Sequence, residues 1–200
     1  VAASYRVFPE DRRFPIKRPD DLPERWVKAG ANAPFRGEAD RGEFYAFQVG
    51  LFAARKPIDG VDVQFSDFRA ATGGSVIPAA ALRCFNVGGT DWTGRAFKKT
   101  VSVAQGKVQP LWLGIQVPAQ AAAGDYRGEV TIAPVGLPPT RVALTLAGSS
   151  RLVAASGDDE PWRYSRLRWL DSTLAFDDEV VAPYTPVQVR DNSVSVLGRS

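Results

Sequence analysis

Histidine is absent from this 200-residue sequence. Its absence removes the commonest general base, the usual base of a catalytic triad and the commonest zinc ligand. Few catalytic mechanisms remain open to such a chain.

Cysteine is almost absent as well, since Cys84 is the only one. A single cysteine excludes an intramolecular disulfide and any metal cluster built from cysteines. Its neighbours, Leu82-Arg83 before it and Phe85 after it, are typical of a strand. We therefore expect Cys84 to be a small, buried apolar side chain.

Long hydrophobic runs are missing too, because no stretch approaches the roughly 20 apolar residues that span a bilayer. Hydrophobic residues make up 44% and charged residues 24%, which are ordinary values for a soluble, folded protein. Residues 1–4 lack the charged segment and apolar core of an export signal. Any such signal is expected to have been removed or to lie outside this sequence.

The charge balance is nearly even, with 25 basic and 22 acidic residues interspersed along the chain. Short basic groups such as Lys98-Lys99 are too small to follow a phosphate backbone, and a solvated strand end explains them. We therefore expect no nucleic-acid partner.

The first 40 residues are rich in proline and charge. Each proline denies a backbone donor to a helix or a sheet. The sequence predicts an extended, proline-rich lead-in over residues 1–40, with one edge strand near residues 5–8. The prolines concerned are Pro9, Pro15, Pro19, Pro23 and Pro34.

Alternating apolar residues, which indicate strands, begin near Gly42 and recur with turn residues between them. The clearest run is residues 110–133, where Leu111 and Leu113 alternate with Trp112 before Pro118 ends the first strand. In the next strand Tyr126 is expected to bond nearby backbone through its hydroxyl, as in the tyrosine corner of immunoglobulin-like domains.

Some seven short strands without an intervening amphipathic helix predict an all-β fold, an immunoglobulin-like antiparallel β-sandwich over residues 41–148. Residues 149–184 are expected to be a linker and packing segment with a short helical or irregular part. Residues 185–200 are predicted to form a terminal hairpin, which either joins the sandwich or starts a further β domain.

Three segments carry a resemblance to a known family. They are GEFYAFQVGLFA at 42–53, PLWLGIQVPAQAAAGDYRGEVTI at 110–132 and SRLRWLDSTLAFDDEVVAPYTPVQV at 165–189. The second resembles an immunoglobulin-like pattern in which a strand ends in Val-Pro and Gly-x-Tyr-x-Gly opens the next. Together they resemble the N-terminal region of secreted bacterial proteins similar to glycoside hydrolase family 123.

The resemblance implies an accessory sandwich that precedes a larger β domain and a (β/α)8 catalytic barrel, which this chain lacks. It implies a secreted, periplasmic or cell-surface parent that acts in glycan breakdown. The partners it implies are a glycan or the remaining domains of that parent.

Asp177, Asp178 and Glu179 form the only dense carboxylate cluster. Substrate-assisted glycosidases use an adjacent Asp-Glu pair, but they place it in a sugar-holding pocket at the end of a barrel strand. A solvated loop, an interdomain ion pair to Arg166 or Arg168, or a calcium site are the alternatives. We expect no catalytic residues and no cofactor in this chain, with calcium the one metal that the cluster allows.

Tryptophan faces can stack on sugar rings, and Trp112, Trp162 and Trp169 are the predicted carbohydrate-binding residues. Trp112 alternates with core-facing leucines, so it should lie on the outer face of its sheet. The alternative is that residues 162–174 fold back and cover it.

Three functions remain open from the sequence. The first is a non-catalytic accessory domain of a glycoside-hydrolase-like protein. The second is a carbohydrate-binding module in its own right, and the third is a structural, adhesin-like assembly module.

Overall fold

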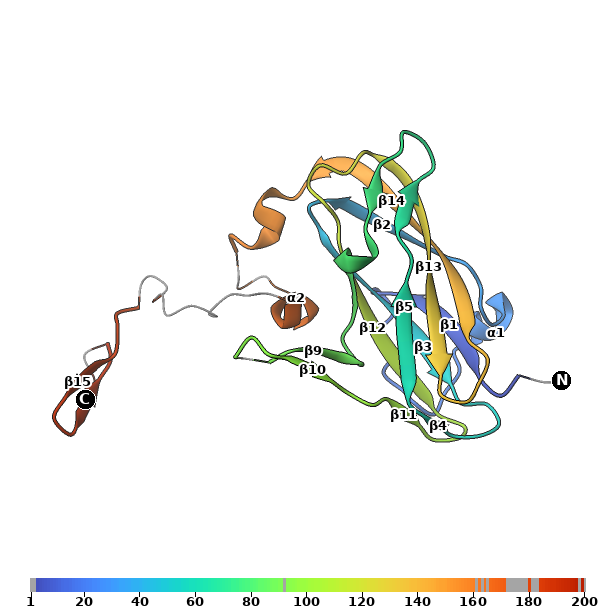
Figure 1. Cartoon of the computed structure of the whole chain (residues 1–200), viewed down its shortest axis with the longest axis horizontal. Coiled ribbons are helices and arrows are strands. Elements are labelled where there is room, and N and C mark those ends of the chain that lie inside the picture. Colours follow the sequence, from blue (N-terminus) through green and yellow to red (C-terminus); the bar gives the residue numbers. More distant parts are fainter. Residues whose placement is uncertain are drawn as a thin grey trace.

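The computed structural model describes residues 3–91, 93–160, 162, 164, 166–171, 180, 184–197 and 199. Two β-sheets packed face to face form the main body of the structure, seen side-on in Figure 1. The all-β sandwich predicted from the sequence is therefore confirmed.

The first sheet has four antiparallel strands in the order β1-β3-β12-β8. Strands β3 and β12 are paired over nine residues each, and every second side chain of both faces the core. The strands are β1 (Arg6–Asp11), β3 (Phe44–Phe52), β8 (Leu82–Cys84) and β12 (Val108–Gln116).

The second sheet has six strands in the order β2-β14-β13-β6-β7, and β5 also pairs with β13. They are β2 (Phe35–Arg41), β5 (Val61–Phe65), β6 (Phe68–Ala70), β7 (Val76–Ile77), β13 (Gly124–Pro134) and β14 (Thr140–Leu152). The pairing of β2 with β14 is parallel, which departs from the wholly antiparallel expectation. Parallel neighbours cannot be joined by a tight hairpin, and here most of the sandwich separates the two strands in sequence.

The core lies between the two inner faces. Removing these side chains from water supplies the main stabilising term, about 25 cal/mol per Å² of apolar area. The largest fully buried side chains are Tyr45, Phe47, Leu51, Leu111, Leu113 and Ile115 from the first sheet and Phe68, Ile77, Tyr126, Ile132 and Leu146 from the second.

Two predictions for single side chains are confirmed. Cys84 is buried on β8, and burial raises the pKa of its thiol to about 11. The Tyr126 hydroxyl lies 2.8 Å from the carbonyl oxygen of Ala122, to which it donates, and 3.0 Å from Ser75 Oγ. This contact ties the start of β13 to the loop that precedes it.

The lead-in differs from the extended segment that its prolines predict. Besides the edge strand β1, it contains α1 (Glu24–Ala29) and the sheet strand β2. Trp26 of α1 is only 3% exposed and stacks on Phe8, with the ring centroids 4.9 Å apart. A buried indole gives this short helix a docking point that proline spacing does not reveal.

Small ladders and turns complete the chain. Strands β4 (Ile58–Asp59) and β11 (Ser102–Val103) pair with each other, as do β9 (Gly88–Thr90) and β10 (Ala96–Lys98). Short 3₁₀ turns lie at Ala79–Ala81 and Ala154–Gly157. The terminal hairpin predicted from the sequence forms from β15 (Gln188–Arg190) and β16 (Ser193–Ser195), and its strands join neither sheet.

A second helix, α2 (Arg166–Asp171), lies in the segment where the sequence predicts a helical part. It lies close to β9, as Figure 1 shows. Within the described residues, no helix has the length and apolar character needed to cross a bilayer.

Candidate functional site

Trp112 lies on the outer face of the four-stranded sheet, as its alternation with core residues predicts. It is opposite Gln48 in the pairing of β12 with β3, and its side chain is half-buried. On the edge of β12 away from β3, two hydrogen bonds fix the backbone of Trp112. Its N–H donates to Asn86 Oδ1 at 2.6 Å, and its carbonyl accepts from Phe85 N at 3.0 Å. Trp112 is thus a rigid part of the sheet with only part of its ring open to a ligand.

Farther along the outer face, α2 contacts Phe44, which pairs with Gln116 on β12. The Arg168 guanidinium lies 5.7 Å from the centre of the Phe44 ring and forms an ion pair with Asp158. Phe44 in turn contacts Phe85 edge-on, with the ring centroids 6.2 Å apart. The helix therefore contacts the sheet at Phe44 through a cation on an aromatic ring.

The other two predicted tryptophans are much more open. Trp162 is 77% exposed and Trp169 is 46% exposed. Trp169 meets Tyr164 edge-on, with the ring centroids 5.0 Å apart. The ring contacts of the described residues join Trp169 to Tyr164 and do not join Trp112 to either of the other two tryptophans. The carbohydrate-binding role of these three residues stays a prediction.

The carboxylate cluster Asp177, Asp178 and Glu179 lies outside the described residues. Its predicted roles, as an interdomain pair or a calcium site, remain predictions. Arg168, one of its predicted ion-pair partners, pairs with Asp158. In the part of the chain that the structure describes, no three His, Cys, Asp or Glu side chains are grouped so as to hold a metal ion.

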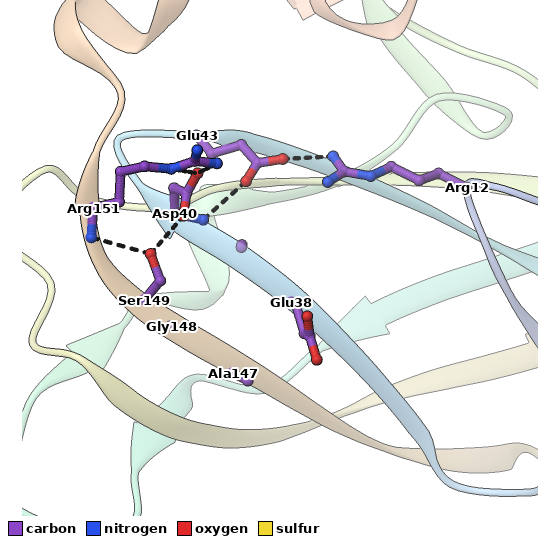
Figure 2. A pocket seen from close by; sticks show the side chains of 9 residues that line it. Arg12, Glu38, Asp40, Glu43, Ala147, Gly148, Ser149 and Arg151 are labelled. Atoms are coloured by element: carbon purple, nitrogen blue, oxygen red, sulfur yellow. Dashed lines mark hydrogen bonds and ion pairs between the residues drawn. The ribbon is translucent and has the colours of Figure 1, made fainter.

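A polar pocket that sequence reasoning missed lies where β14 bulges away from β2. Three residues of β14, at positions 149–151, lie between its last regular partner, Gly148, and Leu152, while β2 has only Asp40 in the same interval. Such a bulge bends the strand and redirects its side chains. Here it turns Ser149 and Arg151 toward Asp40, as Figure 2 shows.

The pocket has a volume of about 350 Å³ and is lined mainly by charged side chains. Asp40 accepts hydrogen bonds from Ser149 Oγ at 2.5 Å and from Arg151 Nε at 2.7 Å. Glu43 accepts from the backbone N–H of Asp40 at 2.8 Å and from the Arg12 guanidinium. Two carboxylates are therefore each held by an arginine from a distant part of the chain (Figure 2).

The electrostatics of this pocket suit ionised carboxylates. Hydrogen bonds from Arg151 and then Ser149 lower the pKa of the Asp40 carboxyl below its usual value. A general acid must hold a proton near neutral pH, which requires the opposite shift. The pocket can hold charged groups in fixed positions, but Asp40 cannot act in it as a proton donor.

The sequence holds only a faint signal for this pocket. Asp40 and Glu43 flank a glycine turn at Gly42, and Ser149 and Arg151 lie in the segment, residues 149–184, that the sequence predicts to be a linker. Nothing in their spacing indicates that residues about 110 positions apart would meet, because that contact depends on the parallel pairing of β2 and β14.

Known proteins resemble the chain in sequence over one part and in fold over a larger part. Residues 90–134 match the family model of the glycoside hydrolase 123 N-terminal domain. A family 123 glycoside hydrolase from Clostridium perfringens, described in a structural analysis of glycolipid glycan hydrolysis, has a similar fold, with a TM-score of 0.56 and 14% identity. The similarity covers 75% of this chain and 28% of that enzyme, so the chain spans less than a third of its length.

Other matches are weaker. The PapD-like domain 7 of human CEP192 aligns with a TM-score of 0.38 and 14% identity, over 73% of this chain and 87% of that domain. No curated protein matches the chain significantly. The chain is similar to the N-terminal region of family 123 glycoside hydrolases.

Proposed function

We propose that the chain is a non-catalytic accessory β-sandwich domain of a glycoside-hydrolase-like protein that acts in glycan breakdown. The observation that carries the proposal is the match of residues 90–134 to an N-terminal domain that is named for such enzymes. That segment includes all of β12 and β13, which are interior strands of the four-stranded and the six-stranded sheet respectively. In this proposal the parent is secreted, periplasmic or cell-surface, and its remaining domains are the chain's first partners.

The chemistry of the Asp40 pocket supports a non-catalytic role. Most glycoside hydrolases need one protonated carboxyl group and a second carboxylate at a set distance across the scissile bond, and substrate-assisted ones also use a carboxyl group as the acid. Asp40 is held ionised by Arg151, and Glu43 is bound to Arg12 and to backbone. Both carboxylates are therefore committed to internal partners.

An activity assay tests the proposal. The purified chain is expected to release no measurable product from a panel of aryl glycosides, including the N-acetylated hexosaminides. Glu179→Gln and Asp40→Asn are the matched variants. Hydrolysis by the purified chain that either substitution abolishes would refute the non-catalytic role.

Carbohydrate binding in its own right is the second candidate, favoured by the open indole of Trp162. An exposed tryptophan face offers apolar area to a pyranose ring while its edge stays hydrated. Trp112, Trp162 and Trp169 would then be the binding residues, with Trp112 contributing least because it is half-buried.

Isothermal titration against a glycan panel separates this candidate from a purely accessory role. Binding that weakens in Trp162→Ala and Trp169→Ala, but not in Phe14→Ala, would support a binding module. Phe14 is a suitable control because it is an aromatic residue 48% exposed on a different segment. If no glycan binds, the accessory role stands alone.

A further inference from the structure

A second open pocket lies at the end of the sandwich where β1 begins. It has a volume of about 480 Å³ and is lined by Ala3, Arg6, Ala54, Arg55 and Gln105. Both arginine side chains are exposed, and the described lining includes no acidic residue. The described lining therefore carries two positive charges and no negative one.

Backbone hydrogen bonds fix the three segments that form this pocket. Arg55 N–H donates to the carbonyl of Ser4 at 3.0 Å, and Arg6 lies opposite Phe52 in the pairing of β1 with β3. The turn that carries Gln105 is held by a bond of 2.7 Å from Gly106 N to the carbonyl of Ala53. The two arginines thus extend from neighbouring, fixed stretches of backbone.

Several arginines of the described residues form ion pairs with carboxylates, but Arg6 and Arg55 do not. Neither forms an ion pair there, and Lys107, which is in the turn after Gln105, is already paired with Asp20. The arginines that pair with a carboxylate include Arg12, Arg13, Arg18, Arg25, Arg36, Arg69, Arg141, Arg151 and Arg168.

We propose that the Arg6–Arg55 pocket binds an oxyanion, such as the sulfate or carboxylate group of an acidic saccharide or a phosphate group. A guanidinium is planar and always charged, and its parallel N–H groups match two oxygens of such an anion. Two unpaired guanidiniums at one pocket supply donors for several oxygens, and the Gln105 amide adds a neutral donor. The inference goes beyond the accessory role and does not depend on it, because it rests only on this pocket.

Titration of the complete chain tests the proposal, with inorganic sulfate, inorganic phosphate and glucuronate as separate probes and glucose as the neutral control. In ¹H–¹⁵N spectra at low ionic strength, the expected result is saturable shifts centred on Arg6, Arg55 and Gln105. Added sodium chloride should weaken binding because it screens exposed charges. The strongest of the three probes identifies the anion class.

Variants decide whether these two side chains carry the binding. Arg6→Gln and Arg55→Gln should each weaken it by about tenfold, the usual effect of losing a hydrogen bond to a charged group. Arg55→Lys keeps the positive charge but loses the parallel N–H groups of the guanidinium. Its affinity for the anion should therefore lie between those of Arg55→Gln and the unaltered chain.

The matched control is Arg127→Gln, which removes an exposed arginine from a pocket that Asp67 and Glu129 also line. Melting curves check that all four variants, at these three arginine positions, fold. Equal weakening by Arg127→Gln, or shifts spread over the whole surface, would show nonspecific attraction and overturn the proposal. An absence of saturable shifts with all three anions would overturn it as well, without affecting the accessory role.

Discussion

At the scale of single residues, the contact between α1 and the outer face of the four-stranded sheet depends on a few specific side chains. The Trp26 indole N–H donates to Glu10 Oε2 at 2.7 Å, and Arg25 Nε donates to the same oxygen at 2.6 Å. Glu10 is itself buried, so these bonds satisfy a carboxylate that would otherwise be costly to desolvate. Gly50 lies under the indole, where any Cβ would overlap the ring.

Trp26→Ala should destabilise the chain by about 3 to 5 kcal/mol, because it leaves a cavity and removes a donor from the buried Glu10. Urea unfolding followed by circular dichroism measures the change. Trp162→Ala is the matched control, since the same truncation at an exposed site should change stability by no more than about 0.5 kcal/mol. Equal losses in the two variants would contradict the docking role given to Trp26.

At the scale of elements, the bulge of β14 brings together charged side chains from two distant parts of the chain. Asp40 is on β2, while Ser149 and Arg151 are on β14, so their hydrogen bonds reinforce the parallel pairing of the two strands. Because the folded state lowers the pKa of Asp40, the ionised carboxylate contributes stability above the unfolded-state pKa of about 3.9. That contribution is lost as the pH falls through the lowered, folded-state value.

Asp40→Asn should therefore be less stable than the unaltered chain at pH 7, and the difference should shrink as the pH falls below about 4. Urea midpoints measured from pH 7 to pH 2.5 would show this convergence. Asp59→Asn removes the same charge at an exposed position of β4 that has no ion pair among the described residues. A difference for Asp40→Asn that is the same at every pH would contradict the role of its ionised form.

The strands were the most predictable elements, and the reasons are local. Alternation in β12 and β13 could be seen in the sequence because one face of each is buried by the opposite sheet. The connection between them was also recognisable, since Val117 and Ala121 are buried and Tyr126 bonds Ala122 where the chain passes from one sheet to the other. That passage lies inside the segment that matches the family model.

The helix α1 and the strand β2 could not be predicted, because both depend on distant partners. Six residues are too few for a helix to be stable alone, so α1 exists through Trp26 and its contacts with β1 and β3. Strand β2 depends on β14, which follows it by about a hundred residues. The polar pocket of Asp40 was missed for the same reason, whereas the outward orientation of Trp112 needed only local alternation.

At the scale of the whole molecule, hydrogen bonding is concentrated in the sandwich. Strand β13 pairs with β14 on one side and with β5 and β6 on the other, so its backbone groups are shielded by neighbours on both edges. The terminal hairpin of β15 and β16 has partners only within itself, and Figure 1 shows it apart from the two sheets. Its valines Val189 and Val194 are both more than half exposed.

Hydrogen exchange measured by mass spectrometry should follow this difference. Amides of β13 and β14 should exchange only through global unfolding, because opening them breaks the central ladder of the six-stranded sheet. Amides of β15 and β16 should exchange within the shortest labelling times, since an isolated two-stranded hairpin is only marginally stable in water.

The β9–β10 hairpin is the internal control, because it is equally short but lies close to α2 and continues into the sandwich. We expect its protection to lie between the two extremes. Protection of β15 and β16 as strong as that of β13 would mean that the hairpin packs against the sandwich, contrary to the arrangement found here.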